Sequence, residues 1–344
     1  MAKQAIGIKD VAKAAGVSVG TVSNTFNRPQ SVAPETRERI HAVVQRLGYV
    51  RSESARQLRS GSSRIIGLLV LDMGNPFFVE VARGAERAAR DAGLGVMVCN
   101  TAQSPAKEAE YIELFIEQRV RGVLVTPADP TGHTLAPLRR HGIPHVMVDR
   151  LAEQSQGCSV SVDDVAGGAL AAGHLLAQGH RRIAYVSGPQ HLQQIKDRRM
   201  GALQAIAAAG LPAEALTEIP TQHLDIAGGR DAAARLLGLP DRPTAVFCAN
   251  DLMAVGLQQA LFAAGVKVPD EMTIVGYDDI DFASATAVPL TSVRQPSADM
   301  GRLAAELLLQ EVSADGETET GHEHRHVVLQ PELVVRASSM YRVR

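Results

Sequence analysis

The spacing of apolar residues at the start of the chain predicts three short helices joined by tight turns. Apolar residues in 8–15 recur at the i, i+3, i+4, i+7 spacing of an amphipathic helix. Gly16 then stands where helices often end in a left-handed residue, and Ser18 can cap a second helix. A third apolar stripe runs through 34–47, with a proline in its first turn and a glycine after its end. These elements predict a helix-turn-helix domain over residues 1–50.

From residue 64 onward the pattern changes to apolar runs that alternate with helical stretches. The runs are continuous, as expected of parallel strands that are buried on both faces. They lie at 65–72, 94–100, 122–129, 145–150, 182–188, 244–250 and 273–278. The pattern predicts an α/β body over 64–344, built as two doubly wound parallel-sheet subdomains, with chain crossovers near 160–165 and 280–296. Ligands of such folds bind beyond the carboxyl ends of the strands, which places a site in the cleft between the subdomains.

The pentapeptide GVSVG, residues 16–20, also matches the G-x-S-x-G pattern of a serine-hydrolase nucleophile elbow. Such an elbow needs a buried strand before its serine. The residues before Ser18 are helical in pattern, so the helix-turn-helix interpretation is favoured. No G-x-G-x-x-G follows the first apolar run, and no G-x-x-x-x-G-K-[ST] occurs in the chain, which argues against nucleotide chemistry. We therefore expect neither an enzyme nor a cofactor.

Charge is distributed unevenly and indicates a partner. The chain has 344 residues, 45% of them hydrophobic, which is enough for two or three domains with a large core. Residues 1–60 hold ten Lys or Arg and four acids, a net of +6, whereas the remainder holds 25 and 33, a net of −8. A basic end that carries a helix-turn-helix is typical of a DNA-binding module.

Other compositional features exclude several classes. No segment approaches the about 18 apolar residues of a membrane span, and the polar N-terminus has no signal-peptide core, so we expect a cytoplasmic protein. Cys99, Cys158 and Cys248 are odd in number and far apart, which indicates reduced thiols. The histidines of GHEHRH lie in an acidic, glycine-containing insert over 313–326. Because a solvated loop fixes no geometry, we expect no metal site there.

The first fifty residues carry a family resemblance. IKDVAKAAGVSVGTVSNTFN, followed by VAPETRERIHAVVQRLGYV, resembles the DNA-binding domain of the LacI/GalR family of bacterial repressors. The resemblance implies base contacts from Val19, Gly20 and Asn24, and phosphate contacts from Ser18, Thr21, Ser23 and Thr36. Since Gly20 offers no side chain, Val19 and Asn24 must carry more of the direct readout.

Residues 51–63 form the link to the body and contain one or two possible helical turns before Gly61. Similar repressors fold such a hinge on the operator and push a leucine into the minor groove. By that resemblance Leu58 is the inserted residue, with Arg56 and Arg59 beside the phosphates; the alternative is a flexible linker. The family's usual Pro-Asn before this helix is replaced here by Arg51-Ser52.

Polar and aromatic residues gather at the predicted carboxyl ends of the strands. Carboxylates, amides and guanidinium groups can bind sugar hydroxyls, and aromatic rings can pack on the apolar face of a sugar. The body resembles the periplasmic sugar-binding proteins, and NPFF, VDR, AND, GYDD and VRQP are similar to the set used by ribose-binding family members. The residues implicated are Asp72, Asn75, Phe77, Phe78, Thr126, Asp149, Arg150, Arg198, Asn250, Asp278 and Gln295.

The resemblance implies a regulator that a small sugar controls. The match to the ribose-binding set favours a pentose such as ribose. Thr126 departs from that set, because ribose binders have asparagine there, so a hexose or a nucleoside stays as an alternative. The expected form is a homodimer on a near-palindromic operator, released by its ligand or, in the alternative, dependent on a corepressor. A sugar-transport protein would share the body, yet it would need a signal peptide in place of the basic helix-turn-helix.

Overall fold

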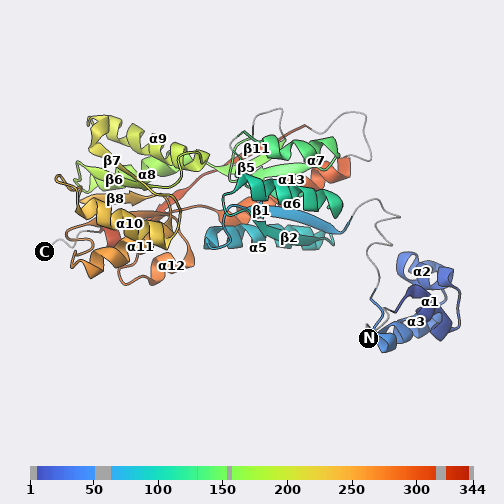
Figure 1. Ribbon diagram of the computed structural model, residues 1–344. Helices are drawn as coiled ribbons and strands as arrows, with labels where there is room; N and C mark the ends of the chain where they lie inside the picture. Colours follow the sequence, from blue (N-terminus) through green and yellow to red (C-terminus); the bar gives the residue numbers. More distant parts are fainter. Residues whose placement is uncertain (1–5, 51–62, 130, 153–156, 315–322, 341–344) are drawn as a thin grey trace. The chain divides into compact units, whose positions relative to one another are not determined.

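The protein contains a small helical unit and a larger α/β body (Figure 1). The computed structural model describes residues 6–50, 63–129, 131–152, 157–314 and 323–340. Its internal contacts divide the chain into two compact units, Met1–Ser63 and Arg64–Arg344.

The helical unit consists of α1 (Ile8–Ala15), α2 (Val19–Asn27), the short 3-10 helix η1 (Pro29–Ser31) and α3 (Pro34–Leu47). Gly16 ends α1 at a φ of 66°, in the left-handed region that glycine adopts without strain. The Ser18 hydroxyl oxygen accepts a hydrogen bond of 3.0 Å from the backbone N–H of Thr21 and so caps α2. Ser18 therefore lies between two helices, and the helix-turn-helix prediction is confirmed.

A small apolar core holds the three helices together. Val11, Val22 and Ile40 are fully buried, one from each helix, and Phe26, Val44 and Leu47 pack around them. These six residues are the inward positions of the predicted amphipathic stripes.

Two six-stranded sheets form the framework of the body, with strand orders β11-β5-β4-β3-β1-β2 and β12-β10-β9-β8-β6-β7. The first sheet contains β1 (Ile65–Val70), β2 (Gly95–Asn100), β3 (Val123–Val125), β4 (His145–Val148), β5 (Cys158–Val162) and β11 (His326–Leu329). The second contains β6 (Ile183–Ser187), β7 (Leu216–Pro220), β8 (Ala245–Cys248), β9 (Thr273–Asp278), β10 (Thr291–Arg294) and β12 (Glu332–Val334).

Helices cover both faces of each sheet. On the first sheet α5 and α13 pack together on one face, while the apolar cluster of α6 and α7 covers the other. On the second sheet α8 packs with α9 and α10 with α11. Their bounds are α5 (Pro76–Asp91), α6 (Pro105–Glu117), α7 (Ala136–Arg140), α8 (Asp164–Ala177), α9 (Gln193–Ala208), α10 (Ile226–Leu237), α11 (Asp251–Ala263), α12 (Asp281–Ala285) and α13 (Ser297–Ala314), with 3-10 turns η2 (His133–Leu135), η3 (Ala213–Ala215) and η4 (Ala337–Ser339).

The seven apolar runs all contain strands, yet one expectation about them is wrong. β2 is not buried on both faces, because it is the edge strand of its sheet and most of its residues are partly exposed. β12 runs antiparallel to β10, so the second sheet is not wholly parallel. Five further strands, β5, β7, β10, β11 and β12, lie outside the predicted runs.

The chain passes between the sheets three times. It leaves the first sheet after Val162, the end of β5, and it returns after Arg294, the end of β10, into α13. Both passages lie within the predicted stretches 160–165 and 280–296. β11 and β12 make a third passage between Leu329 and Glu332, which was not predicted.

Reciprocal glycines let paired helices cross at close range. A Cβ on Gly168 of α8 would overlap the carbonyl oxygen of Arg198 on α9, and a Cβ on Gly201 of α9 would overlap that of Val165 on α8. The α5–α13 and α10–α11 pairs repeat this arrangement. The backbones therefore approach more closely than any side chain would allow, which fixes the start of α9 against α8.

Candidate functional site

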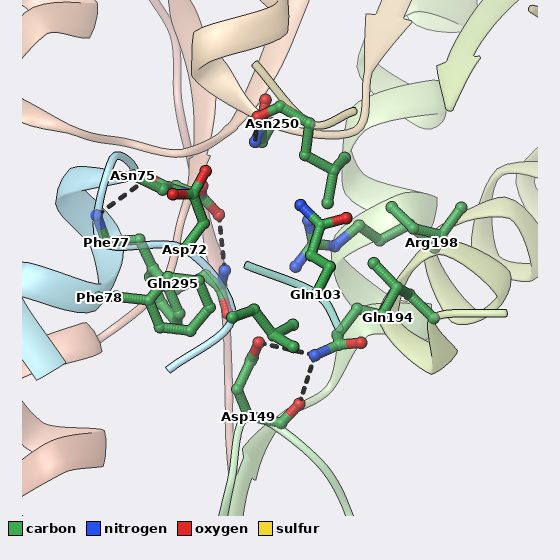
Figure 2. A pocket seen from close by; sticks show the side chains of 15 residues that line it. Asp72, Asn75, Phe77, Phe78, Gln103, Asp149, Gln194, Arg198, Asn250 and Gln295 are labelled. Carbon is green, nitrogen blue, oxygen red and sulfur yellow. Dashed lines mark hydrogen bonds between the residues drawn. The ribbon is translucent and has the colours of Figure 1, made fainter. Parts of the chain in front are cut away.

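A cavity lies between the two sheets of the body, at the carboxyl ends of strands from both (Figure 2). The space between its lining residues, open solvent included, is about 480 Å³. Nine of the eleven predicted binding residues line it: Asp72, Asn75, Phe77, Phe78, Asp149, Arg198, Asn250, Asp278 and Gln295.

One wall of the cavity comes from the turn after β1 and the start of α5. The Asn75 amide oxygen caps α5 by accepting a 3.0 Å hydrogen bond from the backbone N–H of Phe77. Phe77 and Phe78 are both buried and meet edge to face, with ring centroids 5.0 Å apart. Asp72 accepts a hydrogen bond from the backbone of Gly74. Figure 2 shows these side chains on the side of the cavity that faces Arg198 and Gln194.

Asp278 links this wall to the crossover strand. Its two carboxylate oxygens accept hydrogen bonds from the side-chain amides of Asn75, at 2.9 Å, and Gln295, at 2.8 Å. Burial raises the pKa of Asp278 to about 6, although the guanidinium of Arg198 opposes the rise. Asn75 belongs to the first subdomain and Asp278 to the second, so this contact joins the two halves of the body directly.

Asp149 forms the floor of the cavity, directly after β4. One carboxylate oxygen and the backbone carbonyl accept hydrogen bonds of 2.8 Å and 2.9 Å from the Gln194 amide on α9. The other carboxylate oxygen is buried and has no hydrogen-bond partner among the described residues. Burial, helped by the nearby charge of Asp164, raises the pKa of Asp149 to about 8.

Arg198 is the buried cation of the site. Its side chain donates from Nε to Asp164 at 2.8 Å and from one terminal nitrogen to the carbonyl oxygen of Ala249 at 2.6 Å. Its guanidinium carbon lies 3.7 Å from the ring centroid of Tyr277, a cation–π contact. Because a guanidinium has five N–H donors, donors remain for a ligand in the cavity.

Asn250 has a structural role as well as a place in the cavity wall. It caps α11 by accepting a hydrogen bond from the backbone N–H of Met253, and its amide nitrogen donates to the carbonyl oxygen of Leu224. Both ends of this amide are therefore engaged within the protein itself.

The predicted base-reading residues lie on the surface of α2. Val19 is 42% exposed although it is apolar, and Gly20 and Asn24 are also exposed. A Cβ on Gly20 would meet only the hydroxyl of Ser18, at an ordinary 3.5 Å. Of the predicted phosphate contacts, Thr21, Ser23 and Thr36 are partly exposed. The hinge residues Arg56, Leu58 and Arg59 lie outside the described residues.

Two separate families match the two parts of the chain. Residues 7–52 match "Bacterial regulatory proteins, lacI family", and residues 172–339 match "Periplasmic binding protein-like domain". The HTH-type transcriptional repressor PurR of Vibrio parahaemolyticus serotype O3:K6 is 38% identical over 336 residues, covering 96% of this chain and 97% of that protein. The chain belongs to the LacI family of bacterial transcriptional regulators.

Solved structures of LacI-family proteins share the fold. The lac repressor dimer bound to operator and the anti-inducer ONPF is 25% identical, with a TM-score of 0.83 over 98% of this chain and all of that one. A LacI family transcriptional regulator from Enterococcus faecium with bound ribose is 29% identical, with a TM-score of 0.72 over 80% of this chain and 98% of that one. As a LacI-family member, this chain is a DNA-binding transcriptional regulator. Among the described residues, no helix combines the length and apolar character needed to cross a membrane.

Two residues assigned to the ligand of this LacI-family chain lie elsewhere. Thr126 follows β3, is fully buried and is not among the residues that line the cavity. Arg150 turns away from the cavity and donates to the carbonyl oxygen of Asp129 at 3.1 Å, beside a second, acidic hollow. Arg150 was a candidate because it stands at a strand end, and Thr126 because it stands where ribose binders have asparagine. Neither criterion gives the direction of a side chain.

Six cavity residues of this LacI-family body were missed. Leu71 directly follows β1 but is apolar, and the other five follow strands at a greater distance or lie near the start of α9. A search for polar and aromatic residues at strand ends therefore passes over all six. Gln194 in particular stands one turn before Arg198 on α9, a spacing that puts both on the same helix face. The missed residues are Leu71, Gln103, Leu192, Gln194, Ile195 and Leu224.

Replacing Asp149 with asparagine should remove part of the pH dependence of stability. A raised pKa means that the folded protein keeps a proton that the unfolded chain, with an aspartate pKa of 3.8, has released. The contribution of Asp149 to the free energy of unfolding is therefore lost as the pH rises toward about 8, by at most about 1.4 kcal/mol per pH unit. Asparagine resembles the neutral carboxyl group and tolerates the left-handed φ of 59° at this position.

Thermal unfolding of the ligand-free protein, followed from about pH 4 to about pH 8, measures this effect. Relative to the Asp149→Asn variant, the wild type should lose stability across this range. Asp91→Asn, which alters an exposed aspartate at the end of α5, should follow the wild type. Parallel curves for wild type and Asp149→Asn would show that the Asp149 carboxyl group does not hold the proton.

Proposed function

We propose that this LacI-family regulator is a repressor whose affinity for its operator changes when a small sugar, with a pentose such as ribose favoured, binds between the two α/β subdomains. The observation that carries the proposal is the composition of the cavity. Carboxylates of Asp72, Asp149 and Asp278 and the guanidinium of Arg198 surround a space that the rings of Phe77 and Phe78 also reach.

This combination suits a sugar because its two kinds of surface need different partners. Ring hydroxyl groups both donate and accept hydrogen bonds, so they can bridge a carboxylate and a guanidinium group. The C–H face of the ring packs on aromatic carbon. The buried carboxylate oxygen of Asp149 and the amide oxygen of Gln295, which have no hydrogen-bond partner among the described residues, are acceptors that a ligand hydroxyl would satisfy. The relative crystallised with ribose supports the same class of ligand.

Coupling to DNA follows from the position of the cavity between the subdomains. A ligand that contacts both halves favours one relative orientation of them, and it changes operator affinity by the difference in its affinity for the two orientations. The proposed assembly is a homodimer on a near-palindromic operator, in line with the solved lac repressor dimer on its operator.

Two titrations of the purified full-length protein test the proposal. Calorimetry with a panel of pentoses, hexoses and nucleosides should give heat with a pentose, with one site per chain. Operator affinity, measured at one fixed salt concentration with and without that sugar, should then change by about 5- to 150-fold. Heat with nucleosides or disaccharides alone would contradict the sugar assignment, and operator affinity that the bound sugar leaves unchanged would contradict the coupling.

Substitutions on α2 and α3 should separate sequence readout from general affinity. We propose that Asn24 contacts a base and Thr36 a phosphate. Asn24→Ala should then weaken operator binding by about 1–3 kcal/mol while leaving scrambled DNA unaffected. Thr36→Ala should weaken binding to both DNAs alike, by about 0.5–1.5 kcal/mol. Gel-shift titration on both DNAs measures the two effects, with Gln45→Ala on α3 as a control that changes neither. If Asn24→Ala loses the same affinity for operator and for scrambled DNA, Asn24 does not contact a base.

A further inference from the structure

A cysteine, a glutamate and a histidine converge at the end of the first sheet that is opposite the cavity. Cys158 is the first residue of β5, Glu311 lies in the last turn of α13, and His324 lies just before β11. One donor atom from each, a thiol sulfur, a carboxylate oxygen and a ring nitrogen, lies within 4.8 Å of the other two. Because the carboxyl ends of the strands line the cavity and these residues lie at the strand starts, the cluster is separate from the ligand cavity.

The backbone holds this cluster in place from three sides. β5 and β11 pair in parallel, and the backbone N–H of Ser159 donates to the carbonyl oxygen of Arg325 at 3.0 Å. The N–H of Arg325 in turn donates to the Cys158 sulfur at 3.4 Å. Glu311 is supplied by α13, which packs against β5. Strand β5, helix α13 and the segment that leads into β11 therefore supply the three donors, and the pairing of β5 with β11 anchors that segment.

We propose that Cys158, Glu311 and His324 form a binding site for a divalent cation of the zinc class. Thiolate, imidazole and carboxylate are the three ligand types that zinc takes in proteins. Zinc bonds of about 2.3 Å to sulfur and about 2.0–2.1 Å to nitrogen, at tetrahedral angles, place those two ligand atoms about 3.6 Å apart. The Cys158 sulfur and His324 Nδ1 are 4.0 Å apart, so closing this pair on a metal needs a shift of about 0.4 Å. The Glu311 carboxylate oxygen lies within 4.8 Å of both atoms.

Charge and burial also fit such a cation. Cys158 is fully buried, while Glu311 and His324 are half-buried, so the site is shielded on one side and open to water on the other. On binding, the thiol releases its proton to solvent, and the thiolate and carboxylate together cancel the charge of the cation. Water completes the fourth position of the tetrahedron. Hard cations such as magnesium prefer oxygen ligands alone and are not expected to bind.

The neighbouring histidine serves as an internal comparison. His326, two residues further on, points to a different partner, because its Nδ1 lies 2.9 Å from the hydroxyl of Ser159. Ser159 follows Cys158 in the strand, so its side chain lies on the opposite face of the sheet. Of the two histidines, His324 is therefore the one placed to bind the metal.

Cobalt titration of the full-length protein, purified without a polyhistidine tag and stripped of metal, tests the site. One equivalent of Co²⁺ per chain should produce a thiolate-to-cobalt charge-transfer band in the near ultraviolet, and Zn²⁺ should abolish it by displacement. Cys158→Ser should remove the band. Glu311→Gln and His324→Gln should weaken Co²⁺ binding by at least about tenfold. The matched controls Cys99→Ser and His326→Gln should bind as the wild type does.

Thermal unfolding of the wild type tests the site without relying on a variant that could fold poorly. The unfolding temperature should rise with Zn²⁺ and stay constant with the same concentration of Mg²⁺. The absence of a charge-transfer band in the wild type, or a band that persists in Cys158→Ser, would overturn the proposal. Equal thermal shifts with Zn²⁺ for wild type and Glu311→Gln, whose altered residue is half-buried on the last turn of α13, would overturn it as well.

Discussion

Replacing Arg198 with methionine is expected to lower the free energy of unfolding by about 3–5 kcal/mol. The Arg198 and Asp164 side chains are only 6% and 7% exposed and meet at 2.8 Å. Methionine keeps much of the apolar volume of arginine, so the loss reports chiefly the carboxylate of Asp164 left buried without its cation. Urea unfolding of the ligand-free protein measures this loss.

A neighbouring arginine provides the matched control. Arg199 also pairs with a carboxylate, that of Glu218, at the same distance of 2.8 Å, but the two side chains are 43% and 26% exposed. Water already solvates this pair, so Arg199→Met should cost less than about 1 kcal/mol. Equal costs for the two variants would show that burial does not set the value of the Arg198 pair.

A double variant separates the ion pair from the other contacts of Arg198. In an Asp164→Asn background the Asp164 carboxylate is no longer left without its cation, so Arg198→Met should cost about 0.5–3 kcal/mol less than it does in the wild type. The remaining cost then reflects the hydrogen bond to Ala249 and the contact with Tyr277. If the cost of Arg198→Met is the same in both backgrounds, Asp164 is not the partner that matters.

Arg198→Met should also abolish ligand binding. Arg198 lines the cavity with donors that its internal partners do not use. The Arg198→Met variant, where it remains folded, should therefore give no heat with the sugar that the wild type binds, whereas Arg199→Met should bind normally. If Arg198→Met binds the sugar with unchanged affinity, Arg198 only stabilises the second subdomain and does not contact the sugar.

The sequence predicted the strands that are apolar throughout and missed those that are not. The run that contains β9, TIVGYD, is buried at every position, and both of its predicted ends are correct. β5, CSVSV, is equally buried, yet serines at alternate positions interrupt the apolar run that would have predicted a strand. Ser159 finds its partner only in the folded sheet, where it meets His326 of the neighbouring strand. Such a strand is stabilised by its neighbours rather than by its own composition.

Site residues could be predicted where their position in the chain fixes their position in space. Asp149 and Asp278 each stand at a strand end, and the parallel sheets bring such ends together at one edge. Gln103 lies on the loop after β2 and reaches the cavity only because that loop has a particular path. The cluster of Cys158 and His324 is even harder to predict from the sequence. These two residues are 166 positions apart, and the pairing of β5 and β11 brings them together.

Sequence alone also does not show which glycines of a helix pack closely against a neighbouring helix. From the sequence alone, Gly167, Gly168 and Gly173 are all expected to be close-packing positions, and all three lie on α8. A Cβ on Gly167 would overlap the hydroxyl of Tyr277, and one on Gly168 would overlap the backbone of Arg198. Gly173 has no heavy atom within 4 Å of such a Cβ, so for that residue the prediction is wrong. Only the crossing of α8 and α9 distinguishes these positions.

Gly168→Ala is therefore expected to destabilise the protein by about 1–3 kcal/mol, and Gly173→Ala to stabilise it by about 0.4–1 kcal/mol. Both changes add one methyl group to the same helix and raise its helix propensity equally, so propensity cancels in the comparison. At Gly168 the new methyl group meets the carbonyl oxygen of Arg198, a backbone atom that can give way only if α9 moves. Because that movement also displaces the guanidinium group from Asp164 and from the cavity, Gly168→Ala should weaken sugar binding while Gly173→Ala leaves it intact. Urea unfolding and calorimetry on the two variants measure both effects, and similar stabilities for the pair would mean that the α8–α9 crossing yields to an added methyl group without cost.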